Sequence, residues 1–363
     1  MRAFRRFPID DASQVGEARR AALALAGELA FDEESAGRLA LAVTELGTNL
    51  FRHVGPGRQA ALLVGVDETD GLGVQVLSLD RGDGMDLSRC LQDGYSTGGT
   101  SGTGLGAIRR MADRFGGFSA PQRGTVLAAR FGPRTDRSRL GAPATNGATN
   151  GATNGATNSA TNSATNGAFD VAGLSLAAPG ETVSGDAWAL RRDGDRWSLA
   201  AADGLGHGID AAEAADKLMT LLARADAGHL GSPAAFLERS HDSLRSTRGA
   251  ASAALSFTPD GPLLFAGAGN ISGRLISGVS DRTLLSQHGT LGLQIRRLQD
   301  VVYDWPAHAV LVLHSDGIVT RWSLEDTPGL LQADPAVIAG WILRDHLRGK
   351  DDATVVVVRR RHA

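Results

Sequence analysis

Residues Ala202-Asp-Gly-Leu-Gly-His-Gly-Ile209 are the stretch that most directly predicts the fold of the C-terminal half. An apolar run, Trp197 to Ala201, precedes this stretch, and a segment with helical character, Asp210 to Ala225, follows it. An aspartate at a strand end, followed by glycines at alternate positions, lets a carboxylate and a backbone carbonyl face one metal ion, because glycine allows the main chain to come close. The stretch therefore predicts a strand, a metal-binding turn and a helix, in that order.

Three further acidic turns lie beside runs of strand-forming residues. They are Ser184-Gly-Asp186, Ser315-Asp-Gly317 and Lys350-Asp-Asp352. Any one of them, taken alone, is more often only a turn. Magnesium and manganese prefer several oxygen ligands, so four acidic turns gathered by one sheet core favour a divalent-cation site. His207 has two interpretations, proton transfer to a leaving group or local packing within its loop.

Length, charge and cysteine content narrow the class of protein. A chain of 363 residues suits two domains of ordinary size. The net charge of −3 gives no reason to expect nucleic acid or membrane as a partner. The single cysteine, Cys90, forbids an intrachain disulfide and fits a reducing compartment. Asp10 and Asp11 stand where a signal peptide needs its apolar core, and Ala21–Leu25 is too short an apolar run to span a bilayer. We expect a soluble, cytoplasmic protein.

A repetitive tract separates the two halves. Residues Ala144 to Gly167 are six tetrapeptides, four of them Ala-Thr-Asn-Gly and two Ala-Thr-Asn-Ser. Nothing in this tract can bury apolar surface, so it predicts a disordered linker with a span of about 25–30 Å. Repetitive β-structure is the alternative, since Asn-Gly favours hairpins, but no alternating hydrophobic residues flank the turns. We expect domains at 1–133 and 169–363 with a linker at 134–168, and two halves that can meet the same partner without sharing a rigid interface.

The N-terminal half begins with two expected helices, Gln14–Leu29 and Glu33–His53. Glu45 and Asn49 are four residues apart in the second helix, so their side chains project from one helical face. By itself such a pair is typical of a solvated helix surface. His53 at the end of this helix fits a cation near the negative end of the helix dipole.

Two glycine-containing segments follow these helices. The expected strand Val74–Leu79 runs into Asp80, whose carboxylate can accept a hydrogen bond from an adenine amino group, and the turn glycines Gly82 and Gly84 leave space for a flat base. A second segment, Gly98 to Ala107, precedes the helical pattern Ile108–Phe115. A glycine-rich loop that opens a helix offers backbone N–H groups to a polyphosphate. No Gly-Lys-Ser/Thr follows, which excludes a P-loop, and the position after a long loop does not fit a Rossmann turn.

The helix with Glu45 and Asn49 and the two glycine-containing segments occur in the same order as in the Bergerat-fold ATPases, and they resemble that group, which contains histidine kinases, gyrase and Hsp90-type chaperones. Among these they look most like the bacterial anti-sigma-factor serine kinases of the stressosome switch type, over roughly Phe7 to Phe131. The resemblance implies ATP and Mg²⁺, with Glu45 as base for a serine hydroxyl and Asn49 as magnesium ligand. The other implied ATP contacts are Asp80, Gly82 and Gly84 at adenine, Gly102, Gly104 and Gly106 around the phosphates, and Thr125 near the base. No phospho-accepting histidine region precedes the fold, which disfavours a histidine kinase.

The roles of Glu45 and Asn49 can also be argued from the chemistry of phosphoryl transfer, independently of the resemblance. Phosphoryl transfer needs alignment, charge neutralisation by magnesium and a base near the attacking hydroxyl. One helical turn places the two side chains about 6 Å apart, a spacing that can hold base and metal ligand at one γ-phosphate.

The C-terminal half alternates short strands with a few helices. Helical patterns occupy Ala211–Ala225 and Pro233–Ser246, and Asp193-Gly-Asp195 is typical of a hairpin turn. The expected strands are Val171–Leu176, Trp188–Arg191, Trp197–Ala201, Ala251–Phe257, Pro262–Ala266, Ile271–Ile276, Ala309–Leu313 and Thr354–Val358. Many strands with two adjacent helices predict a sheet sandwich flanked by helices, and an α+β class for the whole chain.

This half resembles the manganese- or magnesium-dependent serine/threonine phosphatases, in the branch that includes the sporulation phosphatase of stage II. Its compact length is closest to the stressosome feedback phosphatases. The motifs that carry the likeness are Ser184-Gly-Asp186, Ala202 to Gly208, Arg248-Gly-Ala-Ala, Gly269-Asn-Ile271, His314-Ser-Asp-Gly317 and Asp351-Asp-Ala-Thr354.

The resemblance also implies a set of metal ligands for two Mn²⁺ or Mg²⁺ ions. Asp203 bridges the two ions, the Gly204 carbonyl holds one, and Asp316 and Asp351 bind the second. Asp186 holds metal-bound water, and the choice between Asp351 and Asp352 as direct ligand stays open. A metal-activated water needs no protein nucleophile, and Cys90 lies outside this half.

Together the two halves predict a bifunctional partner-switching regulator in bacterial stress and sigma-factor signalling. A serine/threonine kinase module and a phosphatase module would act on one STAS-class protein, an anti-sigma antagonist or a stressosome scaffold, with one activity suppressed at a time. A sigma factor or a second phosphatase are further partners, and the resemblance allows a homodimer. Two alternatives remain: the ATP-binding module sequesters a sigma factor or regulator, or it gates the phosphatase according to ATP level.

Overall fold

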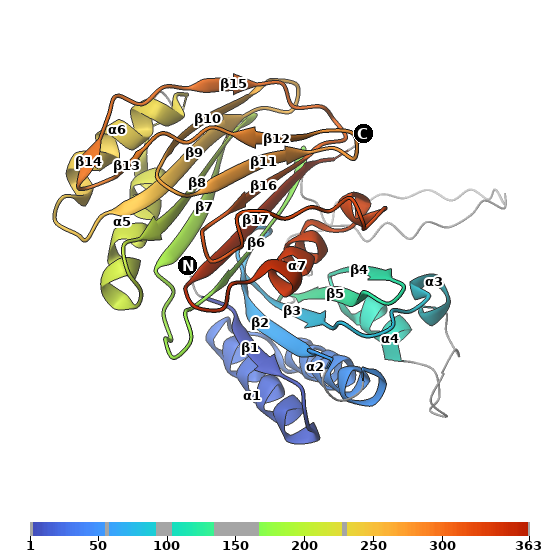
Figure 1. The fold of residues 1–363 in the computed structure, drawn as a ribbon. Coiled ribbons are helices and arrows are strands. Elements are labelled where there is room, and N and C mark those ends of the chain that lie inside the picture. The colour runs from blue at the N-terminus through green and yellow to red at the C-terminus, as the bar shows by residue number, and fades with distance from the viewer. Residues whose placement is uncertain (1–2, 55–57, 92–103, 134–166, 227–230, 362–363) are drawn as a thin grey trace, which may run out of the picture.

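The computed structural model describes residues 3–54, 58–91, 104–133, 167–226 and 231–361 (Figure 1). Most of the expected linker and Gly102 lie outside these described residues. Within them, no helix has the length and apolar character needed to cross a bilayer.

The N-terminal domain is one antiparallel sheet covered on one face by helices. The strand order is β1-β2-β3-β5-β4. Its strands are β1 (Arg5–Pro8), β2 (Ala61–Asp67), β3 (Gly73–Leu79), β4 (Arg114–Ala120) and β5 (Gly124–Phe131). Its helices are α1 (Ala12–Glu28), α2 (Glu33–His53), α3 (Leu87–Cys90) and α4 (Gly104–Met111). A buried cluster joins one face of the sheet to α1, α2 and α4.

Local sequence explains where the long helices begin. The Asp11 side chain accepts from the Ser13 backbone N–H and forms a capping box with Gln14 at the start of α1. Asp32 caps α2 by accepting from the Ser35 backbone N–H, and Arg52 and His53 occupy the last turn of α2, where cations are favoured. The bounds expected for α2 are confirmed.

The fourth helix differs from the sequence prediction. We expected Ile108–Phe115, but α4 begins at Gly104 and ends at Met111. Phe115 lies in β4 instead, opposite Ala129 of β5, and its side chain packs against the same core as the helices. The sheet ladder and this packing outweigh the helical pattern of the segment.

The C-terminal domain stacks two antiparallel five-stranded sheets with helices outside, which confirms the expected sandwich. The orders are β15-β10-β9-β8-β7 and β12-β11-β16-β17-β6. The strands are β6 (Phe169–Leu176), β7 (Asp186–Asp193), β8 (Arg196–Gly204), β9 (Ala250–Phe257), β10 (Leu263–Ala268), β11 (Ser272–Ile276), β12 (Asp281–Leu284), β15 (Val301–Tyr303), β16 (Val310–His314) and β17 (Ala353–Arg360). A two-stranded ribbon, β13 (Gly289–Thr290) and β14 (Gln294–Ile295), and a 3₁₀ turn, Leu330–Gln332, complete the domain.

Helices cover both outer faces of this sandwich. Aromatic and branched side chains, including Phe169, Trp197 and Trp305, fill the space between the sheets. On the first sheet, small outward residues such as Ala200 and Ala254 let α5 (Ile209–Arg224) and α6 (Pro233–Leu244) pack closely. The second sheet is covered by α7 (Pro335–His346).

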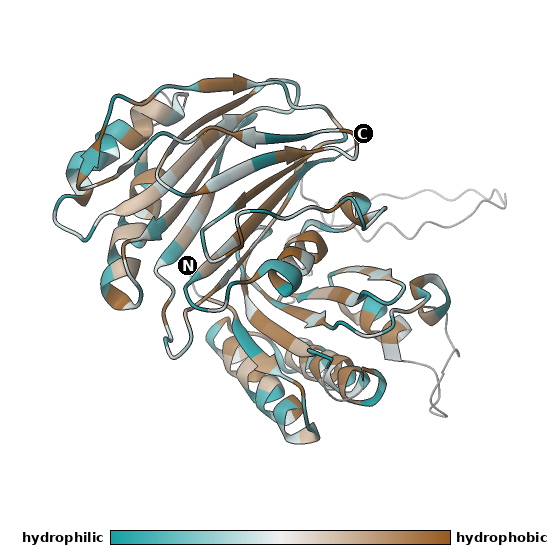
Figure 2. Cartoon of the chain, in the orientation of Figure 1, coloured by the Kyte–Doolittle hydropathy of each residue, from teal (hydrophilic) through white to brown (hydrophobic). Residues whose placement is uncertain are grey.

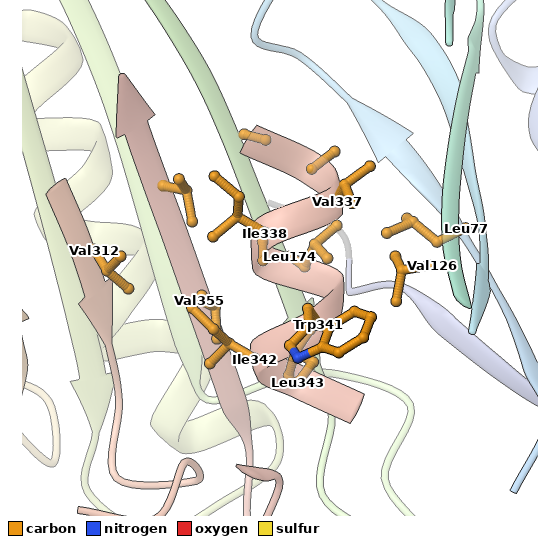
Figure 3. Packing of buried hydrophobic residues seen from close by; sticks show 14 of the residues in the cluster. Leu77, Val126, Leu174, Val312, Val337, Ile338, Trp341, Ile342, Leu343 and Val355 are labelled. Atoms are coloured by element: carbon orange, nitrogen blue, oxygen red, sulfur yellow. The ribbon is translucent and has the colours of Figure 1, made fainter. Parts of the chain in front are cut away.

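Helix α7 was not predicted from the sequence, and it joins the two domains. Every residue from Pro335 to Leu343 is buried. One side of α7 packs on β6 and β17, and the other packs on the N-terminal sheet at Leu77 and Val126 (Figure 3). The ribbon of α7 is largely brown, the colour of hydrophobic residues, in the hydropathy colouring (Figure 2). A helix that is apolar all round is buried all round. The expectation of two halves without a rigid interface is therefore wrong.

Polar contacts reinforce this interface. The Phe4 backbone N–H donates to the Ser175 carbonyl at 2.7 Å, next to an isolated bridge between Phe4 and Leu176. Arg114 Nε donates to Asp334 Oδ2 at 2.5 Å, at the residue that caps α7. One buried cluster therefore continues from the N-terminal sheet through α7 into the second sheet of the C-terminal domain.

Candidate nucleotide and metal sites

The first metal-ligand candidates lie opposite each other on neighbouring strands. Asp186 opens β7 and Asp203 stands near the end of β8, and the two are direct partners in the antiparallel ladder. Partners in a ladder project their side chains from the same face of the sheet. The two carboxylates are therefore held together by backbone pairing.

The second sheet brings the remaining carboxylates to the same end of the sandwich. Asp316 follows β16, and Asp351 and Asp352 precede β17. Ser315 connects the sheets, because its Oγ donates to Asp186 Oδ2 at 2.6 Å and accepts from the Thr354 backbone N–H at 2.9 Å. The four acidic turns singled out in the sequence are thus brought together.

Asp351 and Asp352 have different surroundings. Asp352 is 3% exposed, and its two oxygens accept from the backbone N–H groups of Ala178, at 2.8 Å, and Gly185, at 2.9 Å. Asp351 is exposed, and its Oδ1 accepts from the Asp352 backbone N–H at 2.9 Å. Asp352 is therefore committed to holding the loop at Ser184–Asp186, whereas Asp351 faces outward.

The glycine turn after Asp203 is shaped by its contact with α5. A Cβ on Gly204 would lie 2.0 Å from the Ala211 carbonyl oxygen, so no larger residue fits there. The Gly204 N–H donates to Gly185 at 3.0 Å, and Leu205 donates to the Gly249 carbonyl at 3.0 Å. These bonds fix the turn between the two loops that flank it.

Burial and mutual repulsion raise the pKa values of three carboxyls in this cluster, Asp186, Asp203 and Asp352. Burial is the main cause for Asp203, and the charges of the other four aspartates, Asp186, Asp316, Asp351 and Asp352, add to it and bring its pKa to about 8. Burial likewise raises the pKa of Asp186 to about 7, against the opposing hydrogen bond from Ser315. Gathering like charges in a buried place is unfavourable unless a cation compensates.

One atom of this cluster lacks a partner. Asp186 Oδ1 is buried and makes no hydrogen bond among the described residues. Among all the described residues, no group of three Asp, Glu, His or Cys side chains is arranged closely enough to hold a metal ion. The orphaned oxygen, the raised pKa values and the hard oxygen donors nevertheless fit a divalent cation.

Several residues around this cluster were not assigned a role from the sequence. Asn270 Nδ2 donates to Asp316 Oδ2 at 2.8 Å, and Arg248 forms an ion pair with Asp210. Asn270 and Arg248 lie in motifs that carried the resemblance, and this position in the sequence could have identified them as site residues. His207 Nδ1 lies 2.8 Å from Glu181 Oε1, and the histidine side chain is exposed, so both of its interpretations stay open.

The adenine-site candidates surround the end of β3. Asp80 is 6% exposed, and its Oδ1 accepts from the backbone N–H groups of Gly82, at 2.8 Å, and Thr125, at 3.2 Å. Burial raises the pKa of Asp80, and these two bonds oppose the rise. Asp80 Oδ2 accepts no hydrogen bond from any described residue, so it is left for a donor such as an amino group.

The neighbouring glycine and threonine are constrained as well. Gly84 has φ +81°, and a Cβ there would lie 2.5 Å from the Ala120 carbonyl oxygen, so the turn requires glycine. Thr125 is buried, and its Oγ1 lies 3.0 Å from Ser119 Oγ.

The phosphate-side candidates converge at the start of α4. A Cβ on Gly104 would lie 3.3 Å from Glu45 Oε2 and 3.9 Å from Asn49 Nδ2. Glu45 and Asn49 therefore face the first turn of α4, and Gly106 is buried within that turn. Gly102 lies outside the described residues.

Comparison with known proteins agrees with this division. Residues 7–131 match the model of the histidine kinase-like ATPase domain, and residues 193–361 match the stage II sporulation protein E family. Asp186 falls just outside the second match. Over 116 residues, the chain is 29% identical to the serine/threonine-protein kinase RsbT of Bacillus subtilis. The aligned region covers 31% of this chain and 84% of RsbT.

Solved structures resemble about half of the chain. A structure from work on the bacterial stressosome has 27% identity and a TM-score of 0.48, covering 53% of this chain and 99% of its own. RsbX in complex with magnesium has 19% identity and a TM-score of 0.45, covering 53% and 96%. The RsbU and RsbW domains of a Mycobacterium tuberculosis protein have 22% identity and a TM-score of 0.41, covering 53% and 61%.

The fold, the two sites and the family matches define a two-domain class. The chain joins a histidine kinase-like ATPase domain, related to a serine/threonine kinase, to a phosphatase domain of the stage II sporulation protein E type.

Proposed function

We propose that this chain is a bifunctional partner-switching regulator. Its N-terminal domain phosphorylates a serine or threonine on a STAS-class protein with ATP, and its C-terminal domain removes phosphate from the same class of protein. The carboxylate cluster at the paired strand ends, with the buried and unpartnered Asp186 Oδ1, is the observation that supports the phosphatase most strongly.

In the phosphatase domain, the residues divide into ligands and positioning groups. Asp203, Asp316, Asp351 and the Gly204 carbonyl would hold Mn²⁺ or Mg²⁺, and Asp186 would hold a water molecule. The cations supply a nucleophilic water at neutral pH and neutralise charge on the phosphate. Ser315 orients Asp186, Asn270 orients Asp316, and Asp352 positions the loop that carries Asp186.

In the kinase domain, Asp80 binds the adenine amino group through its free oxygen, and Gly82, Gly84 and Thr125 shape the pocket. Gly104 and Gly106 would contact the phosphates, and Gly102, which lies outside the described residues, is the third proposed contact. Asn49 would hold Mg²⁺, and Glu45 would accept the proton of the attacking hydroxyl group, since both side chains face the start of α4.

The phosphatase part is tested with a phosphorylated STAS-domain peptide and Mn²⁺. The unmutated chain should release phosphate, and Asp203→Asn should reduce the rate by about 100-fold or more while leaving ATP binding intact. Undiminished release by Asp203→Asn would show that the cluster is not the active site.

A further inference from the structure

Arg344 in the last turn of α7 contacts Asp80, and the residues that follow the helix contact the loop after Asp316. We propose that Arg344 of the phosphatase domain is a positioning residue for the adenine acceptor Asp80, and that it couples nucleotide binding to metal binding. This inference rests on the proposed function, because it takes Asp80 and Asp316 as ligand-binding residues.

The first half of the link is a set of bonds between α7 and the end of β3. Arg344 Nη1 donates to the Asp80 carbonyl at 2.6 Å, and Arg81 Nη2 donates to the Arg344 carbonyl at 2.8 Å. Asp345 lies between the two guanidinium groups, with its Oδ1 3.2 Å from Arg81 Nε and 2.9 Å from Arg344 Nε. The two domains thus exchange backbone and side-chain bonds at the residue that would recognise adenine.

Arg344 itself is firmly held. Its side chain is 4% exposed, and its guanidinium carbon lies 3.6 Å from the centre of the Trp341 ring. A stacked and nearly buried arginine is pre-organised, so little conformational freedom is lost when it donates. Its position is set by the core that the two domains share, of which Trp341 is part (Figure 3).

Asp80 has little room to move independently of this contact. A Cβ on Gly124 would lie 2.0 Å from the Asp80 carbonyl oxygen, so the β3 end is pressed against the start of β5. The Asp80 carboxylate is fixed by Gly82 and Thr125. The charge of Arg344 also counteracts the rise in the pKa of Asp80 that burial causes, which keeps the carboxylate available as an acceptor.

The second half of the link is formed by the residues directly after Arg344. The His346 carbonyl accepts from the Val319 N–H at 2.9 Å, and the Arg348 N–H donates to the Gly317 carbonyl at 2.8 Å. Leu347 forms a bridge with Ile318. The backbone from 344 to 348 therefore connects Asp80 to the loop that begins at Asp316.

Two sites that share one short segment are expected to be linked reciprocally. If a cation fixes the Asp316 loop, the end of α7 is fixed with it, and Asp80 loses less freedom when it binds adenine. Reciprocity requires ATP to raise metal affinity by the same factor. Couplings of this kind are typically about 5- to 150-fold.

The test compares ATP with inosine triphosphate, which lacks the adenine amino group that Asp80 would bind. Arg344→Met keeps a side chain over Trp341 but removes every donor. In the full-length chain, calorimetry should show that this variant binds ATP about tenfold more weakly and inosine triphosphate almost unchanged. A merely structural role would weaken both nucleotides equally, or neither, and would overturn the positioning role.

The coupling is measured as the difference in ATP affinity between the chelator-treated chain with and without added Mn²⁺. The same titration on Asp316→Asn subtracts metal bound to the nucleotide itself. We expect Mn²⁺ to strengthen ATP binding in the parent and to have no such effect in Arg344→Met. Equal responses in these two proteins, or none in the parent, would overturn the coupling.

Two further variants serve as controls for this experiment. Asp326→Asn removes another interdomain ion pair, with Arg123, at an exposed position, and it should behave as the parent. Arg81→Met, at a half-exposed site, repeats the test if Arg344→Met unfolds, and it should reduce the coupling. A parent that binds no ATP would refute the nucleotide site itself, whereas normal ATP binding and phosphatase activity without coupling would refute only this inference.

Discussion

Asp186 and Asp203 face each other across neighbouring strands, and Ser315 of the opposite sheet donates to Asp186. This relationship joins the two sheets at the point where the acidic turns meet. It also gathers carboxyl groups in a buried place. The stability of the fold must therefore depend on pH and on whether a cation is bound.

The stability of the metal-free protein should fall as the pH rises. In the folded chain the pKa of Asp203 is about 8, above its ordinary value of 3.8, so the folded state keeps a proton that the unfolded state releases. The resulting stabilisation is complete below 3.8 and is lost as the pH rises through about 8. Thermal unfolding in chelator should show this decline, and Mn²⁺ should reverse it. A pH-independent difference between Asp203→Asn and the parent would contradict the account.

Asp351 and Asp352 should respond differently to substitution. Asp351→Asn removes a proposed ligand and should lower Mn²⁺ affinity by at least about tenfold, with little change in stability. Asp352→Ala leaves the Ala178 and Gly185 N–H groups without acceptors and should cost about 2–3 kcal/mol of unfolding free energy. Metal titration and denaturant unfolding measure the two effects. The reverse pattern would make Asp352 the direct ligand.

Gly84→Ala should damage the nucleotide pocket beyond the cost of backbone strain. Gly71 has a similar φ, +77°, but a Cβ there would meet nothing within 4 Å, so Gly71→Ala is the matched control. The control should lose about 1 kcal/mol of stability and keep ATP affinity. Gly84→Ala should lose more stability and weaken ATP binding, because its Cβ meets the Ala120 carbonyl. Equal behaviour of the two variants would show that the close contact is unimportant.

Trp341→Ala should destabilise both domains together. Trp341 is 1% exposed and packs edge-on against Phe118 of the N-terminal domain, with ring centres 5.0 Å apart. Removing a buried aromatic side chain costs about 3–5 kcal/mol. Calorimetry of the parent should give one unfolding transition, and both ATP and Mn²⁺ should raise its midpoint temperature. Two separate transitions, each responding to only one ligand, would contradict a shared core.

Local patterns predicted the long helix and the acidic turns well. Helix α2 has the expected bounds because its apolar stripe and its end residues agree. The hairpin at Asp193–Asp195 forms as expected, with Gly194 at φ +60° between β7 and β8. The acidic turns come together because each follows or precedes a strand of one sandwich.

Helix α7 and the interface around it depend on information that local patterns lack. The run from Ala336 to Leu343 is continuously apolar, so its periodicity does not distinguish a buried helix from a buried strand. Asp334 and Pro335, a capping residue followed by proline at the first helical position, were a usable signal for a helix start. The docking of α7 on Leu77 and Val126 is long-range, and no spacing in the sequence encodes it.

The most direct test of the account uses the Asp203→Asn chain, in which the phosphatase should be silent and the ATP site intact. It is incubated with labelled ATP, Mg²⁺ and the STAS-domain protein encoded nearest to its gene, and phosphoserine or phosphothreonine is then sought on that protein. We predict label that disappears when Glu45→Ala is added to the same chain and that the unmutated protein removes with Mn²⁺. No label, despite measured ATP binding and phosphatase activity in the parent, would contradict a kinase and would favour an ATP-binding module that sequesters a partner or gates the phosphatase.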